Sequence, residues 1–270
     1  MTLHDLVDSA RVAPPLDARR RFLRMTERTA VGYARAWPVL VTGLLEPLLY
    51  LLSIGIGVGA LVGDVVFAGR TIPYETFVAG GMLATAAMNG AVFDTTFNFF
   101  IRLKYAKLYD AVLATPLEPR DVALGEVTWA LLRGAFYSTV FLLTMTALGL
   151  VESWWGLLAL PATVLIGAAF AAAGLAASTY MRSFLDFDFI NLAITPMFLF
   201  SATFFPLEEY PGWLAVVVQL TPLYQGVALC RALTTGEVEP ALLLHVAYLA
   251  AMVLVGVRIA GRRIDALLRS

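Results

Sequence analysis

Residues 156–180, GLLALPATVLIGAAFAAAGLAASTY, form an unbroken apolar stretch that contains no acidic or basic side chain. An α-helix rises about 1.5 Å per residue, so about 20 apolar residues cross the roughly 30 Å hydrocarbon core of a bilayer. Inside lipid, backbone N–H and C=O groups must be hydrogen-bonded within the protein, and a continuous apolar run achieves this as a helix. The stretch therefore predicts a membrane-spanning helix, and its many Ala and Gly residues predict tight packing against other helices.

Five more stretches of this kind set the expected architecture. In chain order, the six apolar stretches lie at about 38–62, 75–100, 122–150, 156–180, 188–206 and 241–260. The composition agrees, because 60% of the residues are hydrophobic and only 14% are charged, whereas a soluble domain has about 45–50% apolar and about 25% charged residues. The runs are continuous rather than alternating, which argues against a membrane β-barrel. The sequence predicts an all-α integral membrane protein with six transmembrane helices.

The basic residues are sorted between the gaps that separate these stretches. Sixteen of the nineteen lie before the first stretch, between the second and third, between the fourth and fifth, or at the end of the chain from Arg258 onward. The three exceptions are Arg70, Arg133 and Arg231. Cytoplasmic loops of membrane proteins carry the excess of Lys and Arg. We therefore expect a multi-pass protein of a bacterial inner or plasma membrane with both termini in the cytoplasm.

The two ends of the chain lie outside the expected transmembrane domain, which covers 37–262. Residues 1–15 are an expected cytoplasmic tail, and 263–270 an expected cytoplasmic C-terminus. In 16–36, apolar side chains interleave with arginines, which is typical of an amphipathic helix that lies in the membrane interface. Its arginines would face anionic lipid head groups; the alternative is a solvated cytoplasmic arm. The predicted interfacial residues are Arg20, Arg21, Arg24 and Arg28.

The segment 207–240 is external by the charge rule, yet it is half apolar. Pro211, Pro222 and Gly236 divide it into pieces that are each too short to span a bilayer. Apolar stretches of 10–14 residues are more often re-entrant or interfacial than spanning. We expect an external re-entrant pair of short helices before the last span. The alternative, one additional tilted span, would place the C-terminal arginines outside, against the charge rule.

Three motifs carry a resemblance to a known family. They are GLLEPLLYL at 43–51, LYDAVLATPL at 108–117 with DVALGE at 121–126, and SATFFPLEEYPGWL at 201–214 with LTPLYQ at 220–225 and Arg231. In this order and spacing they resemble the permease subunit of ABC-2 type exporters, in the branch that includes nodulation-factor lipooligosaccharide and drug-resistance permeases. The resemblance covers about 35–265.

The resemblance implies that 103–116 is a coupling helix that docks in a groove of an ATP-binding subunit. The residues themselves fit this role, because a short amphipathic cytoplasmic helix with exposed apolar side chains needs a partner. The alternative is a helix that rests on the lipid head groups. The residues predicted to contact the ATP-binding subunit are Lys104, Tyr105, Lys107, Leu108, Tyr109, Asp110, Leu113 and Pro116.

No chemistry of its own is expected from this chain. The phosphate loop of ATPases needs a Gly-Lys pair, and the only lysines, Lys104 and Lys107, do not follow a glycine. ATP and Mg²⁺ are therefore expected in a partner subunit, with no cofactor here. One cysteine, Cys230, and two histidines, His4 and His245, give no metal or redox motif. We predict no catalytic residue and no metal ligand, so the chain is not expected to be an enzyme.

Ionisable side chains inside the membrane are costly and are therefore candidates for function. Glu46 lies about 8 residues, or roughly 12 Å, into the first stretch. It can face a substrate pathway, pair with Arg133, or cap a helix junction before Pro47. Asp94 and Asn98 are one helical turn apart, and an interhelical hydrogen bond is their simpler role.

The third stretch carries a further pair of charges, Glu126 and Arg133, which lie two helical turns apart. Each can pair with a neighbouring helix, and the sequence does not identify the partners. The predicted pathway or interhelical polar set is Glu46, Asp94, Asn98, Phe97 and Arg133.

The expected function is that of the transmembrane subunit of an ATP-driven exporter. The resemblance implies two copies of an ATP-binding subunit and a second permease, either the same chain or a sister chain. The expected cargo is amphipathic, namely a glycolipid, a lipid-linked glycan or a hydrophobic drug, and membrane lipids are further partners; no nucleic-acid partner is expected. The main alternative is an ion-coupled secondary transporter or channel, for which Glu46 is the candidate carboxylate. A third possibility is a structural membrane subunit without transport.

Overall fold

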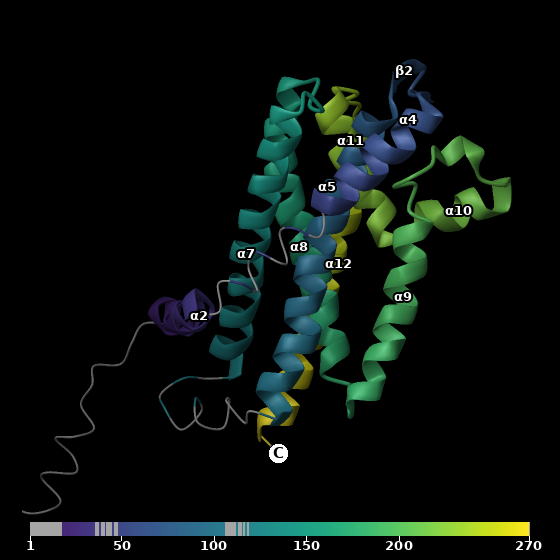
Figure 1. Cartoon of the computed structure of the whole chain (residues 1–270). Helices are drawn as coiled ribbons and strands as arrows, with labels where there is room; N and C mark the ends of the chain where they lie inside the picture. The colour runs from purple at the N-terminus through teal and green to yellow at the C-terminus, as the bar shows by residue number, and fades with distance from the viewer. Residues whose placement is uncertain are drawn as a thin grey trace, which may run out of the picture.

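The computed structural model describes residues 18–35, 48–105 and 119–269, together with single positions at 38, 41, 45, 112, 115 and 117. The described chain is an elongated bundle of helices that run lengthwise side by side (Figure 1). Within the described part, four helices are long and apolar enough to cross a membrane, and a bent helix pair is a fifth candidate. The four are Tyr74–Tyr105, Leu124–Ala147, Trp154–Ser178 and Leu242–Arg263.

The centre of the bundle is the helix that begins with α5 (Tyr74–Phe93) and continues through the π-helical turns η2 (Asp94–Asn98) and η3 (Ile101–Tyr105). In its most apolar window 83% of the residues are buried inside the protein, so α5 faces other helices on all sides. Its side chains Phe77, Leu83 and Met88 are fully buried. A helix that is apolar all round and buried all round organises the packing of its neighbours.

Two long helices pack against α5: α7 (Pro119–Ala147) and α8 (Ala159–Ser178), the latter preceded by the short helix η4 (Trp154–Leu158). Helix α8 also packs against α12 (Leu242–Arg269). Small residues make this contact possible, because a Cβ on Gly256 would lie 2.8 Å from the Ala172 backbone. The tight packing predicted for the Ala- and Gly-rich stretch is therefore confirmed.

The basic N-terminal segment is helix α2 (Ala18–Arg35). In Figure 1 it is seen nearly end-on beside α7, so it lies across the bundle. Met25 is 1% exposed, and the Thr26 hydroxyl donates to the Gly125 carbonyl oxygen of α7 at 3.4 Å. The structure thus contains the helix predicted for 16–36, and one side of it rests on α7.

The connection between the first two apolar stretches is a β-hairpin, which the six-helix pattern does not predict. Strand β1 (Asp64–Phe67) pairs antiparallel with β2 (Arg70–Pro73). Ala68 and Gly69 form its two-residue turn with φ values of 50° and 74°. Two positive φ angles match the twist of such hairpins. We call the end of the bundle that carries β1 and β2 the hairpin end.

The fifth apolar stretch is shorter as a helix than predicted, and the first lies partly outside the described residues. The first is described as helix over Leu48–Val62, comprising its opening turn, η1 (Leu51–Val58) and α4 (Gly59–Val62). The fifth is α9 (Phe187–Leu199), which has 13 residues. A helix of this length reaches about 20 Å at 1.5 Å per residue and does not span the core alone. Among the described residues, four helices and the bent pair are long and apolar enough to span, so the prediction of six spans is confirmed only in part.

The sequence pattern places the end of the fifth span at Pro206, but helix α9 ends earlier, at Leu199. The chain leaves helical geometry over residues 200–205. Ala202 has a φ of 56°, and the Ser201 hydroxyl bonds with that of Thr203 at 2.8 Å. The carbonyl groups of Ala202 and Thr203 point to Arg231 instead of to a following helical turn. Irregular backbone at membrane depth is tolerated when its polar groups are satisfied in this way.

The predicted pair of short helices before the last span is present. After the turn η6 (Leu207–Glu209) come α10 (Gly212–Leu220) and α11 (Pro222–Thr235), which meet at 88°. Thr221 caps α11 by accepting a hydrogen bond from the Tyr224 N–H, and Pro222 occupies the first turn. Gly236, with a φ of 91°, ends α11 in the left-handed conformation.

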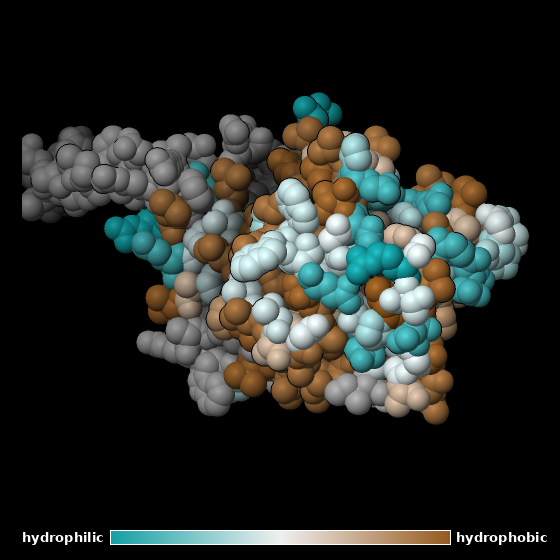
Figure 2. Space-filling model, turned by 90° about the horizontal axis from the view of Figure 1, so that it is seen from above, coloured by the Kyte–Doolittle hydropathy of each residue, from teal (hydrophilic) through white to brown (hydrophobic). Residues whose placement is uncertain are grey.

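The surface of the bundle divides into a polar end and apolar flanks. Figure 2 looks onto the hairpin end, where hydrophilic residues gather over the middle of the face while hydrophobic residues dominate the flanks. The flanks include exposed apolar side chains of α9 and α12: Phe189, Leu192, Leu243, Leu244, Leu254 and Val255. This division is the one expected of a protein whose sides face lipid and whose end faces water.

Candidate functional site

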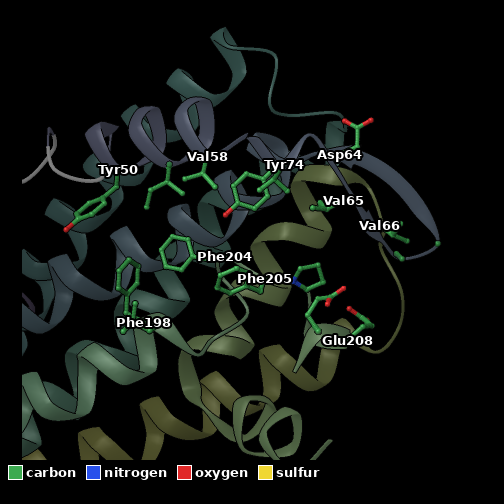
Figure 3. Close-up of a pocket in the computed structure, with 17 residues that line it drawn as sticks. Tyr50, Val58, Asp64, Val65, Val66, Tyr74, Phe198, Phe204, Phe205 and Glu208 are labelled. Carbon is green, nitrogen blue, oxygen red and sulfur yellow. The ribbon is translucent and has the colours of Figure 1, made fainter. Parts of the chain in front are cut away.

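A cavity of about 1060 Å³ opens near the hairpin end (Figure 3). Its walls come from the first helix, the hairpin, the first residue of α5, and the segment from the end of α9 to η6. The residues that line it are Tyr50, Ile54, Val58, Val62, Asp64, Val65, Val66, Ala68, Gly69, Tyr74, Phe198, Leu199, Phe204, Phe205, Pro206, Glu208 and Glu209.

One part of the wall is aromatic. The rings of Tyr50 and Phe198 lie edge to face at 6.3 Å, and those of Phe198 and Phe204 at 5.1 Å. Figure 3 shows these rings together on one side of the cavity, with Tyr74 and Phe205 further along the wall. Such edge-to-face rings form an ordered apolar surface. The cavity therefore offers a preformed binding surface for a large apolar group.

The other part of the wall carries three carboxylates, those of Asp64, Glu208 and Glu209, all of which are exposed. In Figure 3 Asp64 and Glu208 lie on the side away from Tyr50. The described lining residues include no Lys or Arg. The cavity is thus amphipathic, with an aromatic wall and an acidic rim.

Arg231 of α11 binds three backbone carbonyl oxygens behind this wall. Its Nε donates to the Phe77 carbonyl oxygen of α5 at 3.0 Å, and its Nη2 donates to the Ala202 and Thr203 carbonyl oxygens at 2.7 and 3.2 Å. The centre of its guanidinium lies 3.7 Å from the centre of the Phe77 ring, a cation–π contact. One side chain, 3% exposed, thus holds α5, α11 and the 202–203 turn together.

Asp94, Asn98 and Arg133 are brought together by the structure. Arg133 Nε of α7 lies 2.8 Å from Asp94 Oδ2, and both side chains are buried. Asn98 Nδ2 donates to Asp94 Oδ1 at 2.7 Å. The Arg133–Asp94 pair therefore joins two helices, whereas the Asn98 bond to Asp94 lies within one helix. Glu46, the other partner considered for Arg133, lies outside the described residues.

Phe97 is separate from this polar cluster. Its ring stacks on Phe93 at 5.1 Å and meets Phe187 edge to face at 5.4 Å. The remaining charge of the third stretch, Glu126, forms an ion pair with Arg102. The sequence left the partners of Glu126 and Arg133 open, and the structure identifies one for each.

At the end of the bundle opposite the hairpin, the start of the predicted coupling segment packs on the turn before α9. The Tyr105 ring stacks on Phe184 at 4.7 Å, and Phe100 meets both Phe184 and Phe187 edge to face. Lys104 Nζ donates to the Arg182 carbonyl oxygen at 3.4 Å. We call Phe97, Phe100, Tyr105, Phe184 and Phe187 the aromatic cluster.

The turn under the aromatic cluster is the short helix η5 (Phe184–Asp186). The Asp186 carboxylate accepts hydrogen bonds from the Arg182 and Ser183 backbone N–H groups, and these bonds lower the pKa of Asp186 below its ordinary value. An ionised carboxylate at this position fixes the turn that meets Tyr105. The sequence gives only one signal for this arrangement, the Ser183–Asp186 spacing of a capping box.

The other predicted coupling residues, namely Lys107, Leu108, Tyr109, Asp110, Leu113 and Pro116, lie outside the described residues. Within that segment Val112 is buried, and Thr115 N–H donates to its carbonyl oxygen at 3.0 Å. Of the predicted interfacial arginines, Arg24 and Arg28 are exposed, and Arg24 pairs with Glu27 at 2.8 Å. Arg20 and Arg21 lie in α2, with side chains outside the described set.

Comparison with known proteins agrees with this architecture. The family model of the ABC-2 type transporter matches residues 20–234. Nodulation protein J of Rhizobium leguminosarum bv. trifolii is 35% identical over 196 residues, which is 72% of this chain and 73% of that protein. Nodulation protein J of Rhizobium leguminosarum bv. viciae is 30% identical over 237 residues, 87% of this chain and 90% of that protein.

A third relative, nodulation protein J of Rhizobium meliloti (strain 1021), is 33% identical over 196 residues, 72% of this chain and 73% of that protein. The matched region takes in the central helix, the cavity and nearly the whole of the bent pair α10–α11. Family match, relatives and membrane-spanning helices point the same way: this chain is a membrane protein that belongs to the ABC-2 type transporter family.

Proposed function

We propose that this chain is the permease subunit of an ATP-driven exporter that moves an amphipathic substrate out of the cytoplasm or the inner leaflet. In this proposal ATP and Mg²⁺ are bound by two copies of a separate subunit. A second permease, identical or a sister chain, completes the pathway. The permease contributes the route and the mechanical link, and residues 103–116 are the contact with the ATP-binding subunit.

The central helix is the observation that supports this proposal most directly. Tyr74 lines the cavity at one end, and the helix runs without a break in its span to Tyr105, where the predicted coupling segment begins. Its 32 residues correspond to roughly 48 Å at 1.5 Å per residue, more than a bilayer core. A buried, continuous helix is stiff, so a displacement at Tyr105 is passed to the cavity wall.

Two sets of contacts connect the central helix to neighbouring elements, so that these elements would move with it. At the hairpin end, Arg231 binds α5 to α11 and to the 202–203 turn beside the cavity. At the opposite end, the aromatic cluster binds Tyr105 to η5, from which α9 leaves. A push on the coupling segment would therefore reach both walls of the cavity, through α5 and through α9.

ATP can drive such a movement only by differential binding. The ATP-binding subunit must hold the coupling segment differently with and without nucleotide, because a partner that binds both states equally shifts neither. The two permease states would then differ in the distance between α5 and α9 at the cavity.

Copurification with a candidate ATP-binding subunit tests the proposal. We compare the wild type with a Tyr109→Asp/Leu113→Asp variant, since buried carboxylates in an apolar groove are strongly unfavourable. Leu61→Asp is the control, because Leu61 is 87% exposed and lies at the hairpin end, away from the coupling segment 103–116. We expect a complex with the wild type and the control, and loss of the complex in the double variant.

Two results would refute the proposal. In one, the ATPase does not bind the wild type and transport continues without it, which would favour an ion-coupled transporter. In the other, the double variant is folded and binds the ATPase as well as the wild type does, which would remove 103–116 from the contact.

A further inference from the structure

We infer that the cavity at the hairpin end binds the positively charged group of an amphipathic organic cation. This inference names a substrate class for the proposed exporter and so rests on that proposed function. It comes from the chemistry of the walls, which combine an aromatic surface with three carboxylates and, among the described lining residues, no basic side chain.

The aromatic wall suits a cation as well as an apolar group. The faces of Tyr50, Tyr74, Phe198, Phe204 and Phe205 carry negative charge density and attract ammonium, phosphonium or guanidinium groups. An attached ring or alkyl chain would pack on Val58 and Ile54. A cavity of about 1060 Å³ is at the upper end of the usual range for small-molecule sites, about 300–1,000 Å³, so it holds a drug-sized amphiphile.

The carboxylates at the rim differ from Glu152 and Glu237, two acidic groups outside the cavity at this end of the bundle. Glu237 and Glu152 both pair with Arg70, at 2.8 and 3.5 Å, and the hydrogen bond with Glu237 raises the pKa of Arg70. Within the described part of the chain, Asp64, Glu208 and Glu209 form no such pair. Arg70 thus neutralises Glu237 and Glu152 outside the cavity, whereas the carboxylates at the rim are available to another cation.

Arg231 interacts electrostatically with Glu208 but lies outside the lining of the cavity, so the three rim carboxylates outnumber this one cation. The guanidinium lies behind the wall, where it donates hydrogen bonds to the Phe77, Ala202 and Thr203 carbonyl oxygens. An anionic amphiphile in the cavity would meet three carboxylates with no basic residue in the lining to offset them. Apolar walls around the rim strengthen this discrimination, because charges act further in a low-dielectric cleft.

The test uses a pair of ions that have the same size and shape but opposite charge, tetraphenylphosphonium and tetraphenylborate. The full-length permease alone is placed in phosphatidylglycerol nanodiscs, and equilibrium dialysis measures binding after subtraction of empty nanodiscs. We expect saturable binding of tetraphenylphosphonium only. Glu208→Gln/Glu209→Gln should weaken it about tenfold, whereas Glu239→Gln, an exposed acid outside the lining, should leave it unchanged.

A second variant tests that the ion sits inside the cavity. Val58→Trp adds a large ring to the wall and leaves every carboxylate in place, so binding should fall below detection if the cavity is the site. Thermal unfolding of each variant shows that it is folded, and the two exposed glutamates are not part of any core. Binding that survives Val58→Trp would overturn the inference.

The lipid arm identifies which cation occupies the site in a membrane. Phosphatidylethanolamine carries an ammonium group, so adding it to the nanodiscs lowers the affinity for the probe if the lipid competes, and leaves it unchanged if the site prefers a soluble amphiphile. Either result supports a cation site.

Two results would contradict a cation site: equal binding of the borate and the phosphonium, or unchanged phosphonium binding in Glu208→Gln/Glu209→Gln. The binding test contains no ATPase, so its outcome is independent of the copurification. A permease that does not bind the phosphonium can still bind the ATPase, and a permease that does not bind the ATPase can still bind the phosphonium.

Discussion

The three basic residues that break the sorting of charges in the sequence each have a local role in the structure. Arg70 pairs with Glu237 and Glu152, Arg133 lies against Asp94, and Arg231 binds backbone carbonyl groups. A basic residue inside the membrane is costly unless it is paired, and this cost applies to the buried Arg133 and Arg231. At the residue scale, the exceptions to the charge pattern therefore identify the polar contacts that hold the bundle together.

Arg231→Met should destabilise the fold by about 3–5 kcal/mol, because it leaves buried carbonyl groups without donors in an apolar surrounding. Arg231→Lys keeps the charge but should recover little, since one ammonium does not reproduce the planar fork that reaches Phe77 on one side and the 202–203 turn on the other. Thermal unfolding in detergent measures both variants. A Met variant as stable as the wild type would remove Arg231 from this role.

The Asp94–Arg133 pair calls for a double-mutant cycle. Asp94→Leu and Arg133→Met alone should each cost about 3–5 kcal/mol, because each leaves one buried charge uncompensated. The double variant removes both charges and should be considerably more stable than the sum of the single effects predicts. Strict additivity in unfolding measurements would mean that the two side chains do not interact.

At the scale of elements, the sequence predicts whether a segment is a helix better than it predicts where that helix ends. The long apolar stretches became α5, α7, α8 and α12, because a continuous apolar run has one solution in lipid. The bent pair α10–α11 followed from Pro211, Pro222 and Gly236. The hairpin at 64–73 and the end of α9 at Leu199 did not, since a positive φ at Ala68 and carbonyl bonds to a distant Arg231 are not visible locally.

Close packing of α5 against α11 is a further prediction at this scale. A Cβ on Gly80 would lie 2.8 Å from the Arg231 Cα, so Gly80→Ala forces the helices apart and should destabilise the protein by about 1–3 kcal/mol. Gly134→Ala in α7 is the matched control, because nothing lies within 4 Å of its added methyl group. Its higher helix propensity should leave stability unchanged or raise it by up to about 1 kcal/mol. Equal effects of the two substitutions would argue against the close contact.

At the scale of the whole molecule, the sequence indicated a permease, and the structure adds the cavity and its connection to the coupling segment. The cavity was not predictable, because its walls come from four separate segments between Tyr50 and Glu209. The aromatic cluster was equally hidden, since Tyr105 and Phe184 meet only in the folded bundle. Together they make the central helix a link between the predicted ATPase contact and the candidate substrate site.

Reactivity of a cysteine in the cavity tests this link most directly. Val58→Cys places a thiol in the wall, and Cys230, the single native cysteine, is fully buried and stays unreactive. In a complex with the ATP-binding subunit, we expect ATP to change the rate of maleimide labelling at position 58. The change should disappear when the ATPase is omitted or when Tyr109→Asp/Leu113→Asp breaks the contact. An unchanged labelling rate in a complex that hydrolyses ATP would contradict this link.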